Sequence, residues 1–169
     1  MSYRDFQEIA FTMNQVLNGW FFPVPCKHTG TVEPIDEIFP FTVVCSSSKS
    51  EILCSDDCKV EYLVEQHMFG KLPIDRQRLL DAPVSISNIR YPCELDYIDS
   101  LVKETYLEFN RCLCQFGLYV QSLCVVPCRK QNSQVFIYTL ISPENCKLIV
   151  KKTGENLCDA TNFKPHANA

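Results

Sequence analysis

The feature that most restricts the fold is a long amphipathic segment, Cys93 to Gly117, in the second half of the 169-residue chain. Apolar side chains recur there with a period of about 3.6 residues, the spacing of one face of an α-helix. Pro92 stands at its start and Gly117 at its end, where helices favour these residues. The pattern predicts a helix with Leu101, Phe109 and Leu113 buried. The apolar positions are Leu95, Ile98, Leu101, Val102, Tyr106, Phe109, Leu113 and Phe116.

Short runs of β-branched and aromatic residues, separated by turn residues, flank this segment on both sides and predict strands. Strands arranged around one long helix indicate the α+β class. Residues 118–126 and 134–141 predict a β-hairpin whose loop is a basic tip, and residues 84–89 alternate as an extra edge strand would. Residues 67–81 predict an irregular connection with one helical turn at 75–80. The other expected strands are 23–32, 39–46, 51–54, 59–65 and 147–152.

A second amphipathic pattern covers residues 3–18. Phe6, Ile9, Met13 and Val16 fall on one helical face, and Gly19 is a stop signal. Such a helix either covers the core of its own domain or docks on a partner, and we assign these four residues to partner binding. The predicted organisation is an N-terminal helix (1–19), one core domain (20–152) and a flexible tail (153–169).

Charge and hydropathy restrict the surfaces that the chain as a whole can bind, so that any contact with nucleic acid must come from a local patch or from a partner. The chain has 16 basic and 20 acidic residues, a formal net charge of −4, so no global positive field draws it to nucleic acid or anionic lipid. No apolar run approaches the roughly 20 residues that cross a bilayer, and we expect no membrane association. The first residues are polar and charged where a secretory signal would be apolar. We therefore expect an intracellular protein.

Eleven cysteines in a reducing compartment are expected to be thiols rather than disulfides. Zinc requires four converging ligands, usually supplied by closely spaced pairs. Cys54 with Cys58 and Cys124 with Cys128 are the pairs that could supply them, with Cys26 and His28 as a looser third pair. Redox sensing is a further possible use of the thiols. The strand-like surroundings of Cys45, Cys54 and Cys124 favour core packing instead. We expect no metal and no cofactor.

Motifs of catalysis are missing from the sequence. The five glycines are not clustered, so there is no glycine-rich loop that could bring backbone amides to a phosphate. His28, His67 and His166 are the only histidines, and none lies in a nucleophile elbow or a zinc-protease helix. We therefore expect a non-catalytic protein with no small-molecule substrate.

The element order from residue 23 to residue 142, three strands, a helix and two strands, resembles that of the OB-fold, a five-stranded barrel. Residues 27–32, 41–54, 117–121, 129–133 and 135–141 are similar to segments of the middle subunit of replication protein A and its telomere-capping relatives, including those of insects. The chain departs from that family in having Ser46, Ser47 and Ser50 where an Asp-Asp turn and a glycine are usual, and no long helix after Ile141.

This resemblance implies an α+β, partly open five-stranded barrel with an N-terminal helix and a helix inserted between strands three and four. It implies a nuclear, DNA-associated complex, telomere-capping or single-strand-binding, in which the chain docks on protein subunits and contacts single-stranded DNA. A protein-binding adaptor without nucleic-acid contact is the alternative. The residues expected to stack on bases are Phe41, Tyr62, Tyr119 and Tyr138. Those expected to contact phosphates are Lys49, Lys59, Arg129 and Lys130. The acidic residues 33–37 would favour a protein partner.

Overall fold

A computed structural model describes residues 37–49, 51–52, 54–66, 68, 70–130, 135–138 and 145–156. The strands are β1 (Glu37–Ile38), β2 (Phe41–Ser46), β3 (Lys59–Gln66), β4 (Gly70–Ile74), β5 (Leu118–Val125), β6 (Pro127–Arg129), β7 (Val135–Ile137) and β8 (Cys146–Val150). The helices are the 3-10 turn η1 (Ser55–Asp57), α2 (Arg76–Asp81), α3 (Val84–Ser87) and α4 (Pro92–Cys114). The predicted helix over residues 3–18 and the predicted strand over 23–32 lie outside the described residues.

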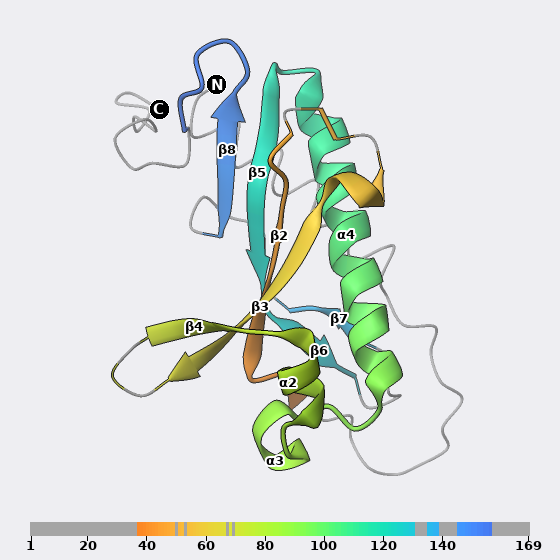
Figure 1. Ribbon diagram of the computed structural model, residues 1–169. Coiled ribbons are helices and arrows are strands. Elements are labelled where there is room, and N and C mark those ends of the chain that lie inside the picture. The colour runs from red at the N-terminus through yellow and green to blue at the C-terminus, as the bar shows by residue number, and fades with distance from the viewer. Residues whose placement is uncertain are drawn as a thin grey trace, which may run out of the picture.

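Two antiparallel sheets and one long helix make up the described fold (Figure 1). The larger sheet has the strand order β4-β3-β2-β5-β8, and the smaller one has the order β1-β6-β7. Helix α4 lies along one face of the larger sheet (Figure 1). The α+β class is therefore confirmed. The described strands do not close into a barrel, because β4 and β8 end the larger sheet without pairing with each other.

Helix α4 confirms the strongest prediction from the sequence. Pro92 occupies its first turn, and the Glu94 carboxylate accepts hydrogen bonds from the backbone N–H of Tyr91 (3.0 Å) and of Arg90 (2.7 Å). These bonds satisfy amides that the helix itself leaves without acceptors. Gly117 follows the helix with φ +71°, a conformation that glycine adopts without strain.

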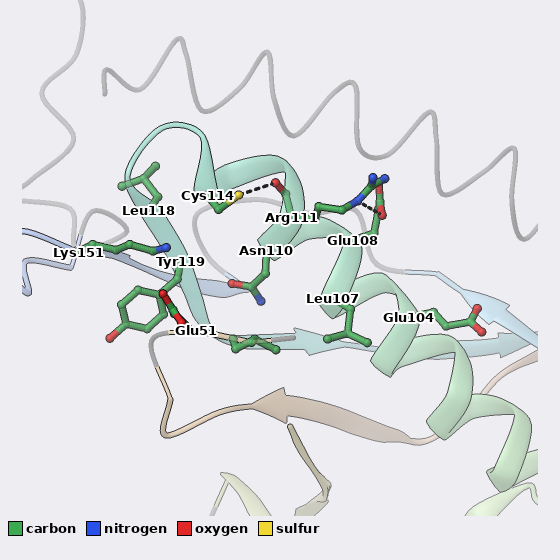
Figure 2. Close-up of a pocket in the computed structure, with 11 residues that line it drawn as sticks. Glu51, Glu104, Leu107, Glu108, Asn110, Arg111, Cys114, Leu118, Tyr119 and Lys151 are labelled. Carbon is green, nitrogen blue, oxygen red and sulfur yellow. Dashed lines mark hydrogen bonds and ion pairs between the residues drawn. The ribbon is translucent and has the colours of Figure 1, made fainter. Parts of the chain in front are cut away.

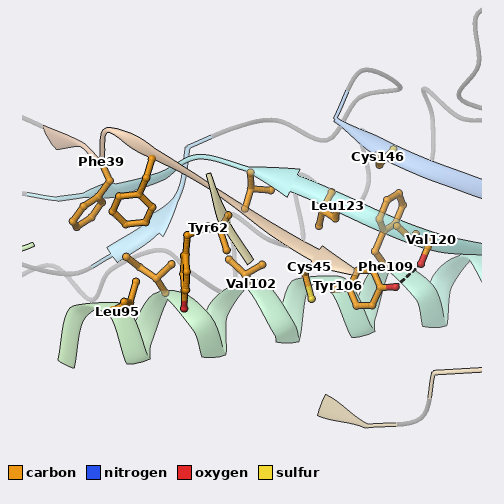
Figure 3. Packing of buried hydrophobic residues seen from close by; sticks show 14 of the residues in the cluster. Phe39, Cys45, Tyr62, Leu95, Val102, Tyr106, Phe109, Val120, Leu123 and Cys146 are labelled. Atoms are coloured by element: carbon orange, nitrogen blue, oxygen red, sulfur yellow. Dashed lines mark hydrogen bonds between the residues drawn. The ribbon is translucent and has the colours of Figure 1, made fainter. Parts of the chain in front are cut away.

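The core lies between α4 and the larger sheet (Figure 3). Leu113 and Phe109 are fully buried and Leu101 is 7% exposed, as predicted. Tyr106 is also fully buried, and its hydroxyl donates to the backbone carbonyl of Val120 at 2.6 Å. This bond satisfies a polar group whose burial would otherwise be costly, and it fixes α4 against β5.

Three local predictions need correction. Residues 84–89 are not an edge strand, because α3 forms there and ends at Asn88 in the left-handed conformation. Strand β4 lies in the predicted irregular connection, and its Pro73 is tolerated because β4 is an edge strand. Residues 51–52 and 54 form no strand. The helical turn at 75–80 is confirmed as α2, with Asp75 accepting from the Arg78 amide at 2.9 Å.

The predicted hairpin of residues 118–126 and 134–141 is also different in the structure. Strand β5 pairs with β2 and β8, whereas β7 pairs with the short strand β6. Arg129 is therefore part of a strand rather than a loop tip. Among the described residues, no helix is long and apolar enough to cross a membrane.

Candidate functional site

A cavity of about 620 Å³ opens beside the C-terminal half of α4 (Figure 2). Helix α4, the beginning of β5, the segment 51–52 and Lys151 after β8 form its walls. The apolar part of the lining is Ile52, Leu107, Leu118 and Tyr119; the polar part is Glu51, Glu104, Glu108, Asn110, Arg111, Cys114 and Lys151.

Hydrogen bonds fix the two principal walls of the cavity against each other. The buried Asn110 side chain donates to the Tyr106 carbonyl (3.0 Å) and accepts from the Val120 amide (2.7 Å). The backbone amide of Lys151 donates to the Gly117 carbonyl at 2.9 Å. Because these bonds join α4, β5 and the end of β8, the cavity has a preformed shape rather than one set by loops alone.

Charge is unevenly distributed in this cavity. Three carboxylates, from Glu51, Glu104 and Glu108, line it together with two basic side chains. The Arg111 guanidinium binds Glu108 (Nε to Oε2, 2.8 Å), so its charge is compensated. Lys151 is exposed and forms no ion pair with any carboxylate of the described residues. Lys151 is thus the cation of this lining that is available to an anionic ligand.

A second polar cluster surrounds Arg129, whose side chain is 3% exposed. Its Nε donates to Glu94 Oε2 at 2.6 Å and its Nη1 to Glu37 Oε2 at 2.9 Å. Its Nη2 donates to the carbonyl of Asn88. Glu37 also pairs with Arg90 at 2.9 Å. The cluster therefore joins β1, β6 and the α3–α4 connection. Its buried charges are paired and hydrogen-bonded, so we assign it to the structure of the fold rather than to ligand binding.

The pKa values of both carboxyls in the Arg129 cluster are lowered. Burial by itself would raise the pKa of Glu94, but hydrogen bonds from Arg129 and from the Tyr91 and Arg90 amides outweigh it. The hydrogen bond from Asn88 is the largest influence on Glu37, and the charges of Arg90 and Arg129 lower its pKa further. Both groups are therefore held in the charged form.

A carboxyl with a lowered pKa in the folded state stabilises the fold above its unfolded pKa, near 4.5 here, and this stability is lost as pH falls through the folded value. We expect the free energy of unfolding to decrease below about pH 4.5, and Glu94→Gln to make this decrease shallower. Urea unfolding at a series of pH values from 3 to 7 measures it. Glu65→Gln, at an exposed position of β3, is the control, and an equal change in slope for both variants would contradict the assignment.

A third cluster joins β3, α2 and α4. The Tyr62 hydroxyl donates to Asp99, and Arg76 binds both Asp99 and Asp96. Burial raises the pKa of Tyr62 and Asp99 raises it further, so the phenol keeps its proton. This cluster does not line the cavity, and it attaches α2 to the rest of the fold.

The aromatic residues predicted to stack on bases do not form one surface. Phe41 and Tyr62 are in the core, where their rings meet at 6.3 Å between centroids. Tyr119 is half-buried in the cavity wall, and Tyr138 is 55% exposed. Phe41 on β2 and Tyr62 on β3 belong to the core between the larger sheet and α4. They therefore fill the core and cannot serve as a surface on which bases stack.

The predicted phosphate-binding residues are also dispersed and mostly engaged. Lys49 pairs with Asp57 at 2.8 Å and Lys59 with Glu61 at 2.6 Å. Lys130 lies over the Phe136 ring at 4.5 Å, and Arg129 is buried. Contact of these residues with nucleic acid is not tested by their positions. The partner-binding assignment of Phe6, Ile9, Met13 and Val16 lies outside the described residues.

The described cysteines do not converge on a metal site. Cys54 is exposed and Cys58 half-buried, whereas Cys45 and Cys128 are buried. The prediction that Cys54 packs in the core is wrong, since it begins the exposed turn η1, where its Sγ faces the Asp57 carboxylate at 3.7 Å. Among the described residues, no three histidine, cysteine or carboxylate side chains form a group that could hold a metal ion.

Comparison with solved structures identifies the fold. The sequence matches no family model and no curated protein. The chain resembles phosphoribosylaminoimidazole-succinocarboxamide (SAICAR) synthase from Ehrlichia chaffeensis, with a TM-score of 0.57 at 14% identity, over 72% of this chain and 54% of that one. It resembles SAICAR synthetase in complex with ADP (TM-score 0.61, 13% identity, 92% and 69%) and the Pyrococcus horikoshii enzyme (0.60, 12%, 92% and 70%).

At this level of identity the likeness establishes the fold alone: this chain has the fold of SAICAR synthetases. It spans about half the length of the Ehrlichia enzyme. The predicted relationship to replication protein A and telomere-capping proteins is therefore wrong, because the solved structures that it resembles are SAICAR synthetases rather than OB-folds.

The functional expectations that depended on the OB-fold are corrected with it. The proteins that share this fold are enzymes, which conflicts with a non-catalytic subunit of a DNA-associated complex. One of them is described in complex with ADP. This conflicts with the expectation that the partners are protein subunits and DNA and that no small-molecule substrate binds. The nuclear location and the division into residues 1–19, 20–152 and 153–169 stay predictions.

Proposed function

We propose that this chain is an enzyme domain that binds a nucleotide, and that the cavity beside α4 is its ligand site. The observation that carries the proposal is Lys151, an exposed cation at a preformed cavity, without an ion-pair partner among the described carboxylates. The fold supports it, since a protein of the same fold is described in complex with ADP.

The cavity suits a ligand of this class in size and lining. Ligand pockets have volumes of roughly 300–1,000 Å³ and combine apolar walls with a few polar groups, and this one measures about 620 Å³. The half-buried side chains of Tyr119, Ile52 and Leu107 offer apolar surface to a base. Figure 2 shows Lys151 on the side of Tyr119 and Glu51, with Glu104 at the other side of the cavity. We therefore place phosphates near Lys151, the cation of the lining that no described carboxylate compensates; the Glu51 carboxylate on the same side would weaken their binding.

Changing Lys151 to Ala is expected to weaken ADP binding by about tenfold or more, because hydrogen bonds to charged groups contribute about 1.5–3 kcal/mol. Isothermal titration calorimetry of the full chain with ADP, at low and high salt, measures the loss. Lys147→Ala is the matched control, since Lys147 is exposed on β8 and does not line the cavity.

Two results would contradict the proposal. If the parent chain shows no heat of binding with millimolar ADP, the cavity is not a nucleotide site. If Lys147→Ala weakens binding as much as Lys151→Ala, the attraction comes from the general charge of this region. Hydrolysis of ATP to ADP and phosphate, with water as the phosphoryl acceptor, is expected with the parent and not with Lys151→Ala if the chain is an enzyme domain.

A further inference from the structure

Two thiols lie close together where the β2–β3 pair ends beside η1. Cys45 on β2 is opposite Val60 on β3, and Cys58 precedes Val60 by two residues in extended conformation (φ −121°, ψ 155°). Because side chains alternate between the faces of a sheet, Cys58 lies on the same face as Cys45, diagonally across the strand pair. Cys45 is in the core between this sheet and α4 (Figure 3), and Cys58 packs against that core.

The two sulfur atoms interact directly. The Cys45 thiol donates a hydrogen bond to the Cys58 sulfur, and the Cys58 thiol donates to the Ser55 carbonyl at 3.0 Å. Cys45 is fully buried, whereas Cys58 is only half-buried. An oxidant in solution therefore reaches Cys58 first, with the Cys45 sulfur already in contact behind it.

A disulfide between these residues requires a small displacement of the backbone. Bridged cysteines have Cα atoms about 4.4–6.8 Å apart, whereas diagonal neighbours in an antiparallel pair are about 7–8 Å apart. Cys58 can move in this way because it lies outside the β2–β3 ladder, whose last pair is Ser46 with Lys59. A bridge formed under strain is readily reduced again, as regulatory disulfides are.

Cys45 and Cys58 stand at the two ends of the connection between β2 and β3, which carries Glu51 and Ile52 of the cavity wall. Joining the ends of a connection restricts the conformations open to the chain between them. We propose that Cys45 and Cys58 are a redox-sensitive pair, whose reversible oxidation to a disulfide fixes the position of Glu51 and Ile52. The pair can act in this way whether or not the cavity binds a nucleotide.

Hydrogen peroxide is an oxidant that completes the reaction. The Cys58 sulfur bonds to one peroxide oxygen, the O–O bond breaks, and the thiol proton leaves with the other oxygen as water, which gives a sulfenic acid. The Cys45 sulfur then attacks the Cys58 sulfur, the S–O bond breaks, and the Cys45 proton leaves with the hydroxyl as a second water. Burial raises the pKa of both thiols more than the Lys103 charge lowers it, so we expect slower oxidation than at a thiol with a lowered pKa.

Peptide mapping of the full chain after treatment with hydrogen peroxide tests the bridge. Digestion without reductant is expected to yield two peptides joined between Cys45 and Cys58, whose fragment ions distinguish Cys58 from Cys54 and which dithiothreitol separates. Cys58→Ser should abolish the bridge. Cys54→Ser is the matched control and should keep it, since Cys54 is exposed at the other end of η1. A bridge between Cys54 and Cys58, bridges only between chains, or no bridge once the exposed thiols are oxidised would overturn the proposal.

Hydrogen–deuterium exchange measures the effect on the β2–β3 connection. In the oxidised parent, the amides of Glu51 and Ile52 are expected to exchange at least about tenfold more slowly than in the reduced parent. Cys58→Ser treated with the same oxidant should show no such difference, and exchange of its α4 amides will report that the fold persists. The parent comparison needs no substitution. Equal exchange at Glu51 and Ile52 in the two states, with the bridge present, would show that the disulfide does not fix this segment and would overturn the proposal.

Discussion

Arg129→Met is expected to lower the free energy of unfolding by about 3–5 kcal/mol, because removing one partner of a buried ion pair leaves the other charge without compensation. The Arg129 and Glu94 side chains are only 3% and 7% exposed, with 2.6 Å between Nε and Oε2. Methionine keeps much of the length and apolar surface of arginine, so the loss reports the charge rather than a cavity. Urea unfolding at pH 7 measures it.

Arg90→Met is the matched control for Arg129→Met. Arg90 also binds Glu37, but its side chain is half exposed, and exposed ion pairs contribute about 0–1 kcal/mol. Adding Glu94→Gln to Arg129→Met should recover part of the stability, because the amide keeps an oxygen for the Tyr91 and Arg90 amides without a buried charge. Equal losses for Arg129→Met and Arg90→Met would show that Arg129 is accessible to water.

Arg129 illustrates what could not be predicted from the sequence. Between two strand-like runs, Arg129 and Lys130 have the pattern of a polar hairpin loop. In the structure, Arg129 instead pairs across β1 and β6 with Glu37, which is 92 residues away in sequence. Sequence periodicity reports local geometry, whereas the partner that makes burial of an arginine favourable comes from a distant segment. A basic residue in a short polar run therefore does not by itself predict a surface.

Local patterns predicted the elements whose periodicity is long and regular. Helix α4 repeats its apolar spacing over six turns, and the sequence of β3 alternates charged and apolar residues from Lys59 to Tyr62, so both were predicted with nearly correct ends. Strand β4 was not, because Gly70 and Pro73 are turn residues in most contexts and only its edge position permits them. Residues 84–87 alternate apolar Val84 and Ile86 with two serines, a pattern that predicts a strand. A single helical turn accommodates the same four residues, and in the structure they form α3.

The fold family was predicted incorrectly because element order does not determine strand pairing. Strands followed by a helix and further strands are compatible both with a closed barrel and with the open order β4-β3-β2-β5-β8. The pairing of β5 with β2, between Val43 and Val125 for example, joins segments far apart in sequence. For the same reason the cavity was missed, since its walls come from residues 51–52, from α4 with the start of β5, and from Lys151.

Replacing Leu113 by Ala is expected to lower the free energy of unfolding by about 2–5 kcal/mol, since truncating a packed leucine removes apolar contacts and leaves a cavity. Leu113 is fully buried in the cluster between α4 and the larger sheet. Neighbours held by hydrogen bonds, such as Asn110 with the Val120 amide, restrict the collapse that would otherwise reduce this cost.

Chemical denaturation measures the Leu113 effect, with Phe116→Ala as the control three residues further along. Phe116 is 54% exposed, and surface substitutions usually change stability by about 0.5 kcal/mol or less. If the slope of the free energy of unfolding against denaturant concentration is the same for the parent and the variant, the difference in stability comes from the folded state rather than from the unfolded ensemble. If Leu113→Ala costs less than about 1 kcal/mol, the face of α4 that carries Leu113 does not pack against the sheet, and the position of the helix over β5 is wrong.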